Sequence, residues 1–169
     1  MTSEFAIAVH ALVFMKHRQC CVSSEKIAEN VCTNPARVRK VLAKLKKAAL
    51  IETKEGIDGG CYFLERPAAV TLDRVCSAVG ELPITVSKRT GDPNMDCLIA
   101  SGMAGVMDGI YGEMNRHCME YLAGITLVDI DDRLFENKSS EEAHGSRKQF
   151  RKKDTCNHTC KKRFKKCYG

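Results

Sequence analysis

Residues 23–64 carry, in succession, the signals of a short helix, a sharp turn, a second helix and a hairpin, and few folds accommodate that order. Ser23 or Ser24 can cap the first helix, over IAENV, because a serine hydroxyl accepts hydrogen bonds from the free amides at a helix start. Thr33 or Asn34 can cap the second helix. Pro35 suits its first position, because the amide that proline lacks would have no partner there.

Two alternating segments, 50–54 and 61–64, follow the second helix and predict the strands of a hairpin. Gly56, Gly59 and Gly60 lie between them, and Asp-Gly and Gly-Gly sequences tolerate the positive φ angles of tight turns. A hairpin that follows two such helices is the layout of a winged helix-turn-helix, whose second helix enters the DNA major groove. We therefore expect a mainly α fold with a small β-hairpin wing.

The second helix has one apolar stripe and is basic over much of its remaining surface. The stripe consists of Val38, Val41, Leu42, Leu45 and Ala49, and the cations are Arg37, Arg39, Lys40, Lys44, Lys46 and Lys47. A solvated basic surface would have the same composition, so the charge alone does not decide. The combination of helix, turn, basic helix and glycine-rich wing favours DNA binding.

Three segments carry a resemblance to a known family: TSEFAIAVHALVF at the start, NPARVRKVLAKLKKAALIETKEGIDGG in the middle and ITLVDI further on. They resemble the Rrf-two (Rrf2) family of bacterial winged helix-turn-helix transcription regulators, which includes IscR-, NsrR- and CymR-like proteins. The resemblance covers roughly residues 1–134. It implies a homodimeric, sequence-specific DNA-binding repressor or activator, of which we favour the repressor, with a long C-terminal helix as the dimer interface.

The resemblance also implies roles for individual residues. Ser23 and Ser24 would begin the helix that touches backbone phosphates, the start of the second helix would face the groove, and the glycine pair would lie in the wing. With the neighbouring cations, the predicted DNA-binding residues are Ser23, Ser24, Thr33, Asn34, Pro35, Arg37, Arg39, Lys40, Lys44, Lys54, Gly59 and Gly60.

Charge divides the chain into three parts. The formal charge is +4 over residues 1–66, −7 over 67–146 and +9 over 147–169. We expect a winged helix-turn-helix domain at 1–66, a connecting helix, loop and dimerisation helices at 67–136, and a flexible basic cysteine-containing tail at 137–169. The acidic middle argues against nucleic acid along it, whereas both basic ends can contact phosphates.

A long helix is predicted over about 97–122. Its apolar residues recur at steps of three or four: Ile99, Met103, Val106, Ile110 and Met114. Four glycines recur there too, at 102, 105, 109 and 112, and each costs a helix interior about 1 kcal/mol relative to alanine. Close approach of a second helix would offset that cost, so we predict a dimerisation helix; the alternative is a poorly formed one. A two-fold dimer would read a palindromic operator in double-stranded DNA.

The signal is the least determined part of the prediction. Iron–sulfur members of the resembled family hold three closely spaced cysteines in the loop before the long helix, but residues 83–104 contain only Cys97. An iron–sulfur cluster is therefore not expected, nor any other bound cofactor in this region. The helix start would favour the thiolate of Cys97, so this residue is a candidate sensor of a redox or thiol-reactive signal. A quiet structural cysteine and a metabolite signal remain alternatives.

The tail supports a second interpretation of the function. Cys156, His158, Cys160 and Cys167 could bind zinc, or the surrounding lysines could form an arm for nucleic acid. The alternative function is thus a thiol- or metal-sensing protein with mainly non-specific nucleic-acid binding through this tail. Ten cysteines without an apparent export signal predict a cytoplasmic protein. We predict no membrane span, and no catalytic motif stands out, so we expect no enzyme.

Overall fold

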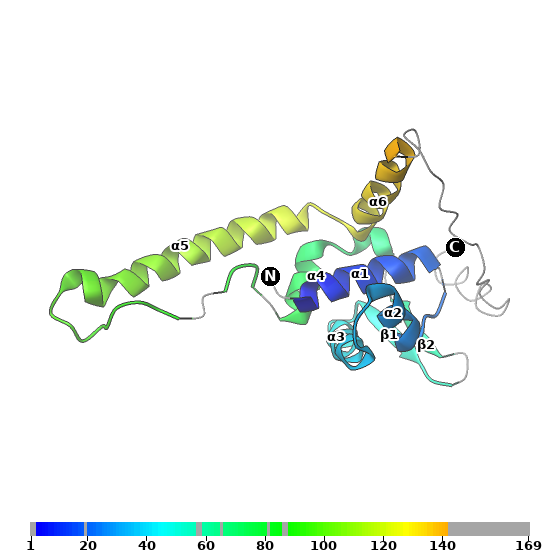
Figure 1. Ribbon diagram of the computed structural model, residues 1–169, viewed down its shortest axis with the longest axis horizontal. Helices are drawn as coiled ribbons and strands as arrows, with labels where there is room; N and C mark the ends of the chain where they lie inside the picture. Colours follow the sequence, from blue (N-terminus) through cyan, green and yellow to red (C-terminus); the bar gives the residue numbers. More distant parts are fainter. Residues whose placement is uncertain are drawn as a thin grey trace.

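The computed structural model describes residues 3–18, 20–56, 59–64, 66–80, 82–85 and 88–141. Within these residues the protein is mainly helical with one two-stranded sheet, as the sequence predicted, and Figure 1 shows how the elements are arranged. In chain order the elements are α1 (Ser3–Arg18), α2 (Ser24–Val31), α3 (Pro35–Lys47), β1 (Ile51–Lys54), β2 (Gly60–Phe63), the 3-10 helix η1 (Pro67–Ala69), α4 (Leu72–Val79), α5 (Leu98–Ala123) and α6 (Leu127–Glu141). No helix of these described ranges is long and apolar enough to span a membrane.

The core is built around α1, which packs against α2, α3, α4 and α6. Its buried side chains occur on more than one side of the helix: Phe5, Ile7, Ala8, Ala11, Leu12, Val13 and Met15. From α3 the predicted stripe supplies Val38, Val41, Leu42 and Leu45, all buried. Since the apolar side of α3 packs into this core, the opposite side of the helix lies on the molecular surface.

The helix-turn-helix has the predicted caps. The Ser23 hydroxyl accepts a hydrogen bond from the amide of Lys26 at 3.3 Å, and the Asn34 side-chain oxygen accepts one from the amide of Ala36 at 2.8 Å. Pro35 occupies the first turn of α3. Between the helices, Cys32 has φ +55, and its amide bonds back to Ala28 and Glu29. This left-handed residue ends α2 and produces the sharp turn.

The hairpin pairs β1 with β2 antiparallel, from Ile51 opposite Phe63 to Lys54 opposite Gly60. Cys61 also exchanges two backbone hydrogen bonds with Val22, at 2.8 and 3.1 Å, so the segment before α2 lies against β2. Gly60 has φ +155, and a Cβ there would lie 2.7 Å from the backbone of Val22. Glycine is thus required at position 60 by close packing at the base of the wing.

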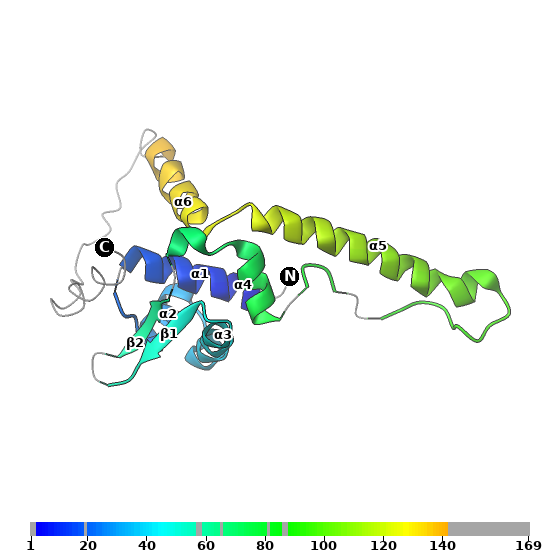
Figure 2. The same cartoon turned by 180° about the vertical axis from the view of Figure 1, so that it is seen from behind.

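The C-terminal half combines one protruding helix with one that returns to the body. α5 projects from the body in Figures 1 and 2, and among its residues only Leu122, near its end, is buried. α6 begins with a reciprocal cap in which Thr126 and Asp129 bond each other's backbone amides. It then packs on α1 through an ion pair between Lys16 and Asp131 and a ring stack between His17 and Phe135.

The predicted tail begins inside this last helix. α6 continues to Glu141, so residues 137–141 are helical where the sequence predicted a linker. Residues 137–141 are Asn-Lys-Ser-Ser-Glu, and the packed residues upstream have already nucleated the helix, so it can extend beyond its apolar contacts. The four candidate zinc ligands, Cys156, His158, Cys160 and Cys167, lie outside the described residues.

Candidate nucleic-acid interface

The exposed side of α3 is narrow and basic. Ala36 and Ala43 lie opposite the buried stripe, and both are exposed. Arg39, Lys40 and Lys47 are exposed around them. Small side chains along the centre let a helix backbone approach another surface closely, and cations at the borders favour a polyanion. The predicted DNA-binding residues did not include Ala36, Ala43 or Lys47, although Lys47 was counted among the cations of this helix. The signal for all three was their helical spacing relative to Val38 and Leu45.

One flank of α3 is held by α2. Arg39 forms an ion pair with Glu25 at 3.1 Å, and the Ser24 hydroxyl donates to the same carboxylate at 3.0 Å. Hydrogen bonding by its own backbone amide, followed by that of Arg39, lowers the pKa of Glu25 to about 2. Both side chains of the pair are exposed, so it contributes little to stability. Its geometry keeps the Arg39 guanidinium beside the start of α2.

The other flank is held by the start of α1. One carboxylate oxygen of Glu4 lies 2.9 Å from the Lys40 ammonium, and the other lies 2.6 Å from that of Lys44. Lys44 also donates to the carbonyl of Val79 at 2.6 Å, at the end of α4. Nearby, the Arg37 guanidinium donates to the Ser3 hydroxyl. These contacts tie α3 to both α1 and α4.

Lys44 lies on the flank of α3 that packs against the body. Its ammonium is engaged by Glu4 and Val79 in the packing of α1, α3 and α4, and the side chain is only partly exposed. The sequence prediction counted every lysine of α3 as surface charge. It could not know which flank would meet the carboxylate of α1.

The wing contributes a smaller cationic surface. Lys46 bonds Glu52 at 2.9 Å and the Thr53 hydroxyl at 2.7 Å, which joins α3 to β1. Lys54, at the end of β1, is exposed. A Cβ at Gly59 would lie 2.5 Å from the carbonyl of Lys54, so this glycine, like Gly60, is required by the hairpin itself.

The remaining predicted residues border α3 at its N-terminal end. Ser23 and Asn34 use a side-chain oxygen for capping, and the amide group of the exposed Asn34 keeps its N–H donors for other partners. Ser24, Thr33 and Pro35 are half-buried beside them. Apart from Lys44, the predicted residues of α2, the turn and α3 thus gather around the N-terminal end of α3.

Cys97 lies far from this surface, at the start of α5. It is the N-cap residue and is exposed. The nearby backbone amides of Ala100 and Ile99, at the start of α5, lower the pKa of its thiol. Cys61 in β2 is the opposite case, because burial raises its pKa to about 11. Among the described cysteines, reactivity is therefore favoured at Cys97 and suppressed at Cys61.

The segment before Cys97 lies along α5. The Asn115 side chain exchanges two hydrogen bonds with the backbone of Ile84, at 2.8 and 3.0 Å, and Arg89 pairs with Asp108 at 2.8 Å. Gly91 has φ +80, and a Cβ there would meet the carbonyl of Ala100 at 2.1 Å. The loop is thus fastened to one side of α5 and leaves its apolar side uncovered.

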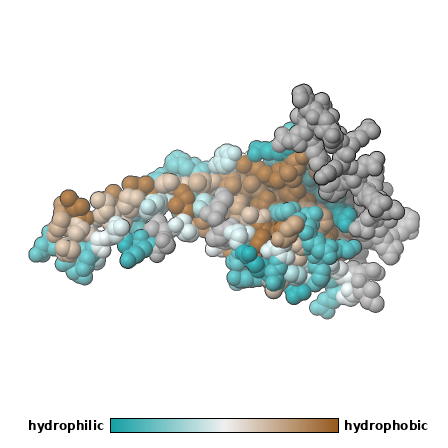
Figure 3. Space-filling model, in the orientation of Figure 1, coloured by the Kyte–Doolittle hydropathy of each residue, from teal (hydrophilic) through white to brown (hydrophobic). Residues whose placement is uncertain are grey.

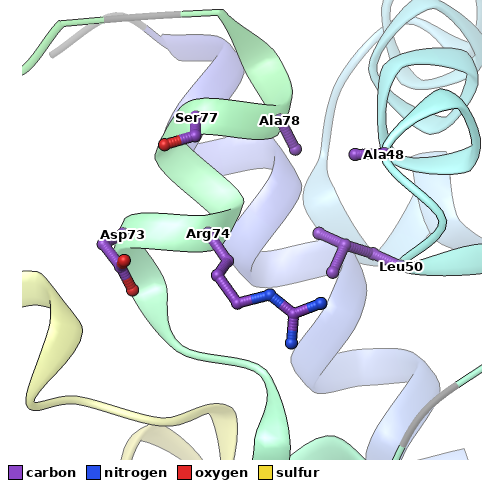
Figure 4. Close-up of a pocket in the computed structure, with 6 residues that line it drawn as sticks. All are labelled: Ala48, Leu50, Asp73, Arg74, Ser77 and Ala78. Carbon is purple, nitrogen blue, oxygen red and sulfur yellow. The ribbon is translucent and has the colours of Figure 1, made fainter.

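A shallow cavity of about 300 Å³ lies between the end of α3 and α4 (Figure 4). Ala48 and Leu50 line it from the α3 side, and α4 contributes Asp73, Arg74, Ser77 and Ala78. The Arg74 guanidinium donates to the carbonyl of Ala69 at 3.0 Å. The cavity is on the side of α3 that packs on the body, not on its exposed basic side.

Known proteins are similar to this chain in sequence or in fold. The chain is 29% identical over 135 residues to a putative HTH-type transcriptional regulator, YwnA, of Bacillus subtilis strain 168, which covers 80% of this chain and 99% of that protein. A putative transcriptional regulator from Lactobacillus plantarum has a similar structure, with a TM-score of 0.69, 23% identity and coverage of 84% and 99%. IscR of T. potens matches with a TM-score of 0.57, 19% identity and coverage of 88% and 93%.

A family model described as an iron-dependent transcriptional regulator, Rrf2, matches residues 1–133. Residues 83–104 contain one cysteine, Cys97 at the start of α5, while Cys76 is buried in the core. Within the described ranges no three His, Cys, Asp or Glu side chains are grouped to hold a metal ion. The family match spans the helix-turn-helix of α2 and α3, the wing formed by β1 and β2, and the long α5. The chain therefore belongs to the Rrf2 family of transcriptional regulators.

Proposed function

We propose that two copies of this chain join through α5 and read a palindromic operator with their two α3 helices, acting as a cytoplasmic transcription repressor. The observation that carries the proposal is the exposed side of α3, where two alanines are bordered by Arg39, Lys40 and Lys47. Such a helix can enter the major groove deeply, because its centre is small and its borders are cationic. The family resemblance is compatible with a repressor or an activator, and of the two we propose the repressor.

The surrounding groups have distinct roles in this proposal. Cations neutralise phosphates and set the salt dependence of affinity, whereas groups at the start of α3 reach base edges. We assign base contacts to the end of α3 that holds Asn34 and phosphate contacts to Arg39, Lys47 and Lys54. Lys44 is left out, because Glu4 and Val79 already bind its ammonium.

The uncovered side of α5 supports dimerisation. Its exposed apolar residues are Leu98, Ile99, Met103, Val106, Ile110, Met114 and Tyr121. Figure 3 shows apolar residues along the length of α5. At Gly102, Gly105, Gly109 and Gly112 a Cβ would meet nothing within 4 Å, so packing inside one protomer does not require glycine there. A second α5 lying close against this side accounts for both features.

The signal is proposed to act on Cys97. Oxidation or alkylation of this thiol, at the point where the fastened loop joins α5, would disturb the start of the dimer helix and the relative placement of the two α3 helices. Replacing Cys97 by Ser should therefore make operator release insensitive to oxidant. Unchanged release would show that the signal acts elsewhere, including through a metabolite.

The alternative function is non-specific binding through the basic tail, with thiol or metal sensing by Cys156, His158, Cys160 and Cys167. Two full-length variants separate the readings. Ala43→Glu places a carboxylate at the centre of the exposed side of α3, and Ala68→Glu places one on exposed η1. Binding is measured by gel shift on a duplex enriched from random DNA, with excess competitor.

The proposal predicts that Ala43→Glu abolishes the specific complex and that Ala68→Glu retains it. Equal binding by both variants, with uniform and steep salt dependence on any duplex, would favour the tail instead. Zinc content of the purified full-length protein, before and after replacement of the four tail ligands, tests the metal part of the alternative.

A further inference from the structure

We propose that Glu4 increases the preference of α3 for specific over non-specific DNA by holding Lys40 and Lys44 of α3 against α1. The inference rests on the proposed DNA contact by α3. Glu4 acts as a positioning residue. Through Lys44 it orients α3, and by pairing with Lys40 it reduces the amount that Lys40 adds to non-specific phosphate binding.

The geometry gives the two lysines different roles. Each oxygen of the Glu4 carboxylate takes one ammonium, at 2.9 Å for Lys40 and 2.6 Å for Lys44. The side chains are 21% exposed for Glu4, 35% for Lys44 and 67% for Lys40. Lys44 is anchored a second time, by the carbonyl of Val79. Lys44 therefore acts as the fixed anchor, and Lys40 is the arm that can exchange Glu4 for a phosphate.

That exchange replaces one anionic partner by another. A lysine already paired with a carboxylate attracts fewer counter-ions and gains less from a phosphate than a lysine in water does. Without the Glu4 charge, Lys40 would act as a full phosphate contact. Hydrogen bonding by Lys44, then by Lys40, also lowers the pKa of Glu4 to about 2, so the carboxylate is charged at every pH at which binding is measured.

The consequence differs between specific and non-specific DNA. Non-specific binding depends almost entirely on phosphates, so it gains the whole of a released Lys40 contact. Specific binding also needs α3 in a fixed orientation for base contacts, and Glu4 supports that orientation through Lys44. Loss of the Glu4 charge should therefore raise non-specific affinity more than specific affinity.

The test compares Glu4→Gln with Glu29→Gln in the full chain. Glu29 is exposed on α2, and among the described residues no ion pair joins its carboxylate to α3. Both variants lose one negative charge near the reader, but only Glu4→Gln releases Lys40. Affinity is measured by fluorescence anisotropy between 50 and 200 mM salt, on the enriched duplex and on a scrambled duplex of equal length.

For Glu4→Gln on scrambled DNA we expect the slope of log affinity against log salt to steepen by about one per bound protomer, a further roughly threefold loss over this salt range. The preference for the enriched duplex over the scrambled duplex should fall below that of the wild type. Glu29→Gln should leave both quantities near the wild-type values. Adding Lys40→Gln to Glu4→Gln should restore the wild-type slope, and a thermal melt monitors folding of each variant.

Equal slopes for Glu4→Gln, Glu29→Gln and the wild type would overturn the inference. A second result would also overturn it: Lys40→Gln lowers the slope of log affinity against log salt by the same amount in the wild-type background as in the Glu4→Gln background. Lys40 would then already contact phosphate freely in the wild type. If instead the wild type shows no preference for any duplex, the proposed function fails. The slopes on scrambled DNA would still report on Glu4 in that case.

Discussion

Replacing Ile110 by Glu should weaken the dimer that α5 is proposed to form. Ile110 is 47% exposed in a single protomer, and complete burial of an isoleucine contributes about 1.5–3 kcal/mol. Covering the exposed half thus contributes about 0.7–1.4 kcal/mol per copy, or about 1.5–3 kcal/mol per two-fold dimer. At about 1.4 kcal/mol per factor of ten, the substitution should raise the dimer Kd roughly tenfold to a hundredfold. A desolvated carboxylate adds to that loss.

The assay is sedimentation equilibrium of the full chain over a range of concentrations. Leu64→Glu is the matched control, because Leu64 is 48% exposed but follows β2 instead of lying on α5. Its dimer Kd should stay within a few fold of the wild-type value. A wild-type protein that stays monomeric at micromolar concentrations would refute the reasoning, as would equal Kd values for the two variants.

Three further predictions concern stability and the thiols. Leu45→Ala, at a fully buried site of α3, should lower the free energy of unfolding by about 2–5 kcal/mol, measured by urea denaturation; a change below 1 kcal/mol would contradict the packing described. The depressed pKa of Glu4 stabilises the fold fully above about pH 4.5, and this contribution is lost as pH falls towards 2. The wild type should therefore exceed Glu4→Gln in stability at pH 6 and lose that margin by pH 2, and a margin independent of pH would refute the assignment. Iodoacetamide at neutral pH should modify Cys97 well before Cys61, as followed by peptide mass spectrometry, and the reverse order would contradict the environments found for the two thiols.

The fold of the first half was largely predictable because its signals are local. Ser23, Asn34 and Pro35 mark helix starts through hydrogen bonds within a few residues, and these caps are present. Gly80, at φ +71, ends α4 in a left-handed conformation that glycine adopts readily. The apolar spacing of residues 99–114 also predicted the bounds of α5 to within about one residue, because apolar spacing and helix length are properties of the segment itself.

The electrostatic partners on α3 were not predictable, because they depend on which distant segment packs against each flank. Glu4 is forty residues from Lys44 in sequence, and only the burial of α1 in the core brings them together. The same packing decides that Lys44 faces the body while Lys47 stays on the surface. Pattern and composition gave the sign of the charge on this helix, and tertiary packing determined which charges are available.

The most direct test of the central claim is selection of bound sequences from random DNA by the full-length protein, followed by footprinting of the enriched site. Two-fold reading by α3 predicts an enriched palindrome whose half-sites are separated by about one helical turn, roughly 10 base pairs, or a multiple of it. Protection should cover both half-sites and disappear with Ala43→Glu. Failure to enrich any sequence, or enrichment that survives Ala43→Glu, would contradict the assignment of α3 as the reader.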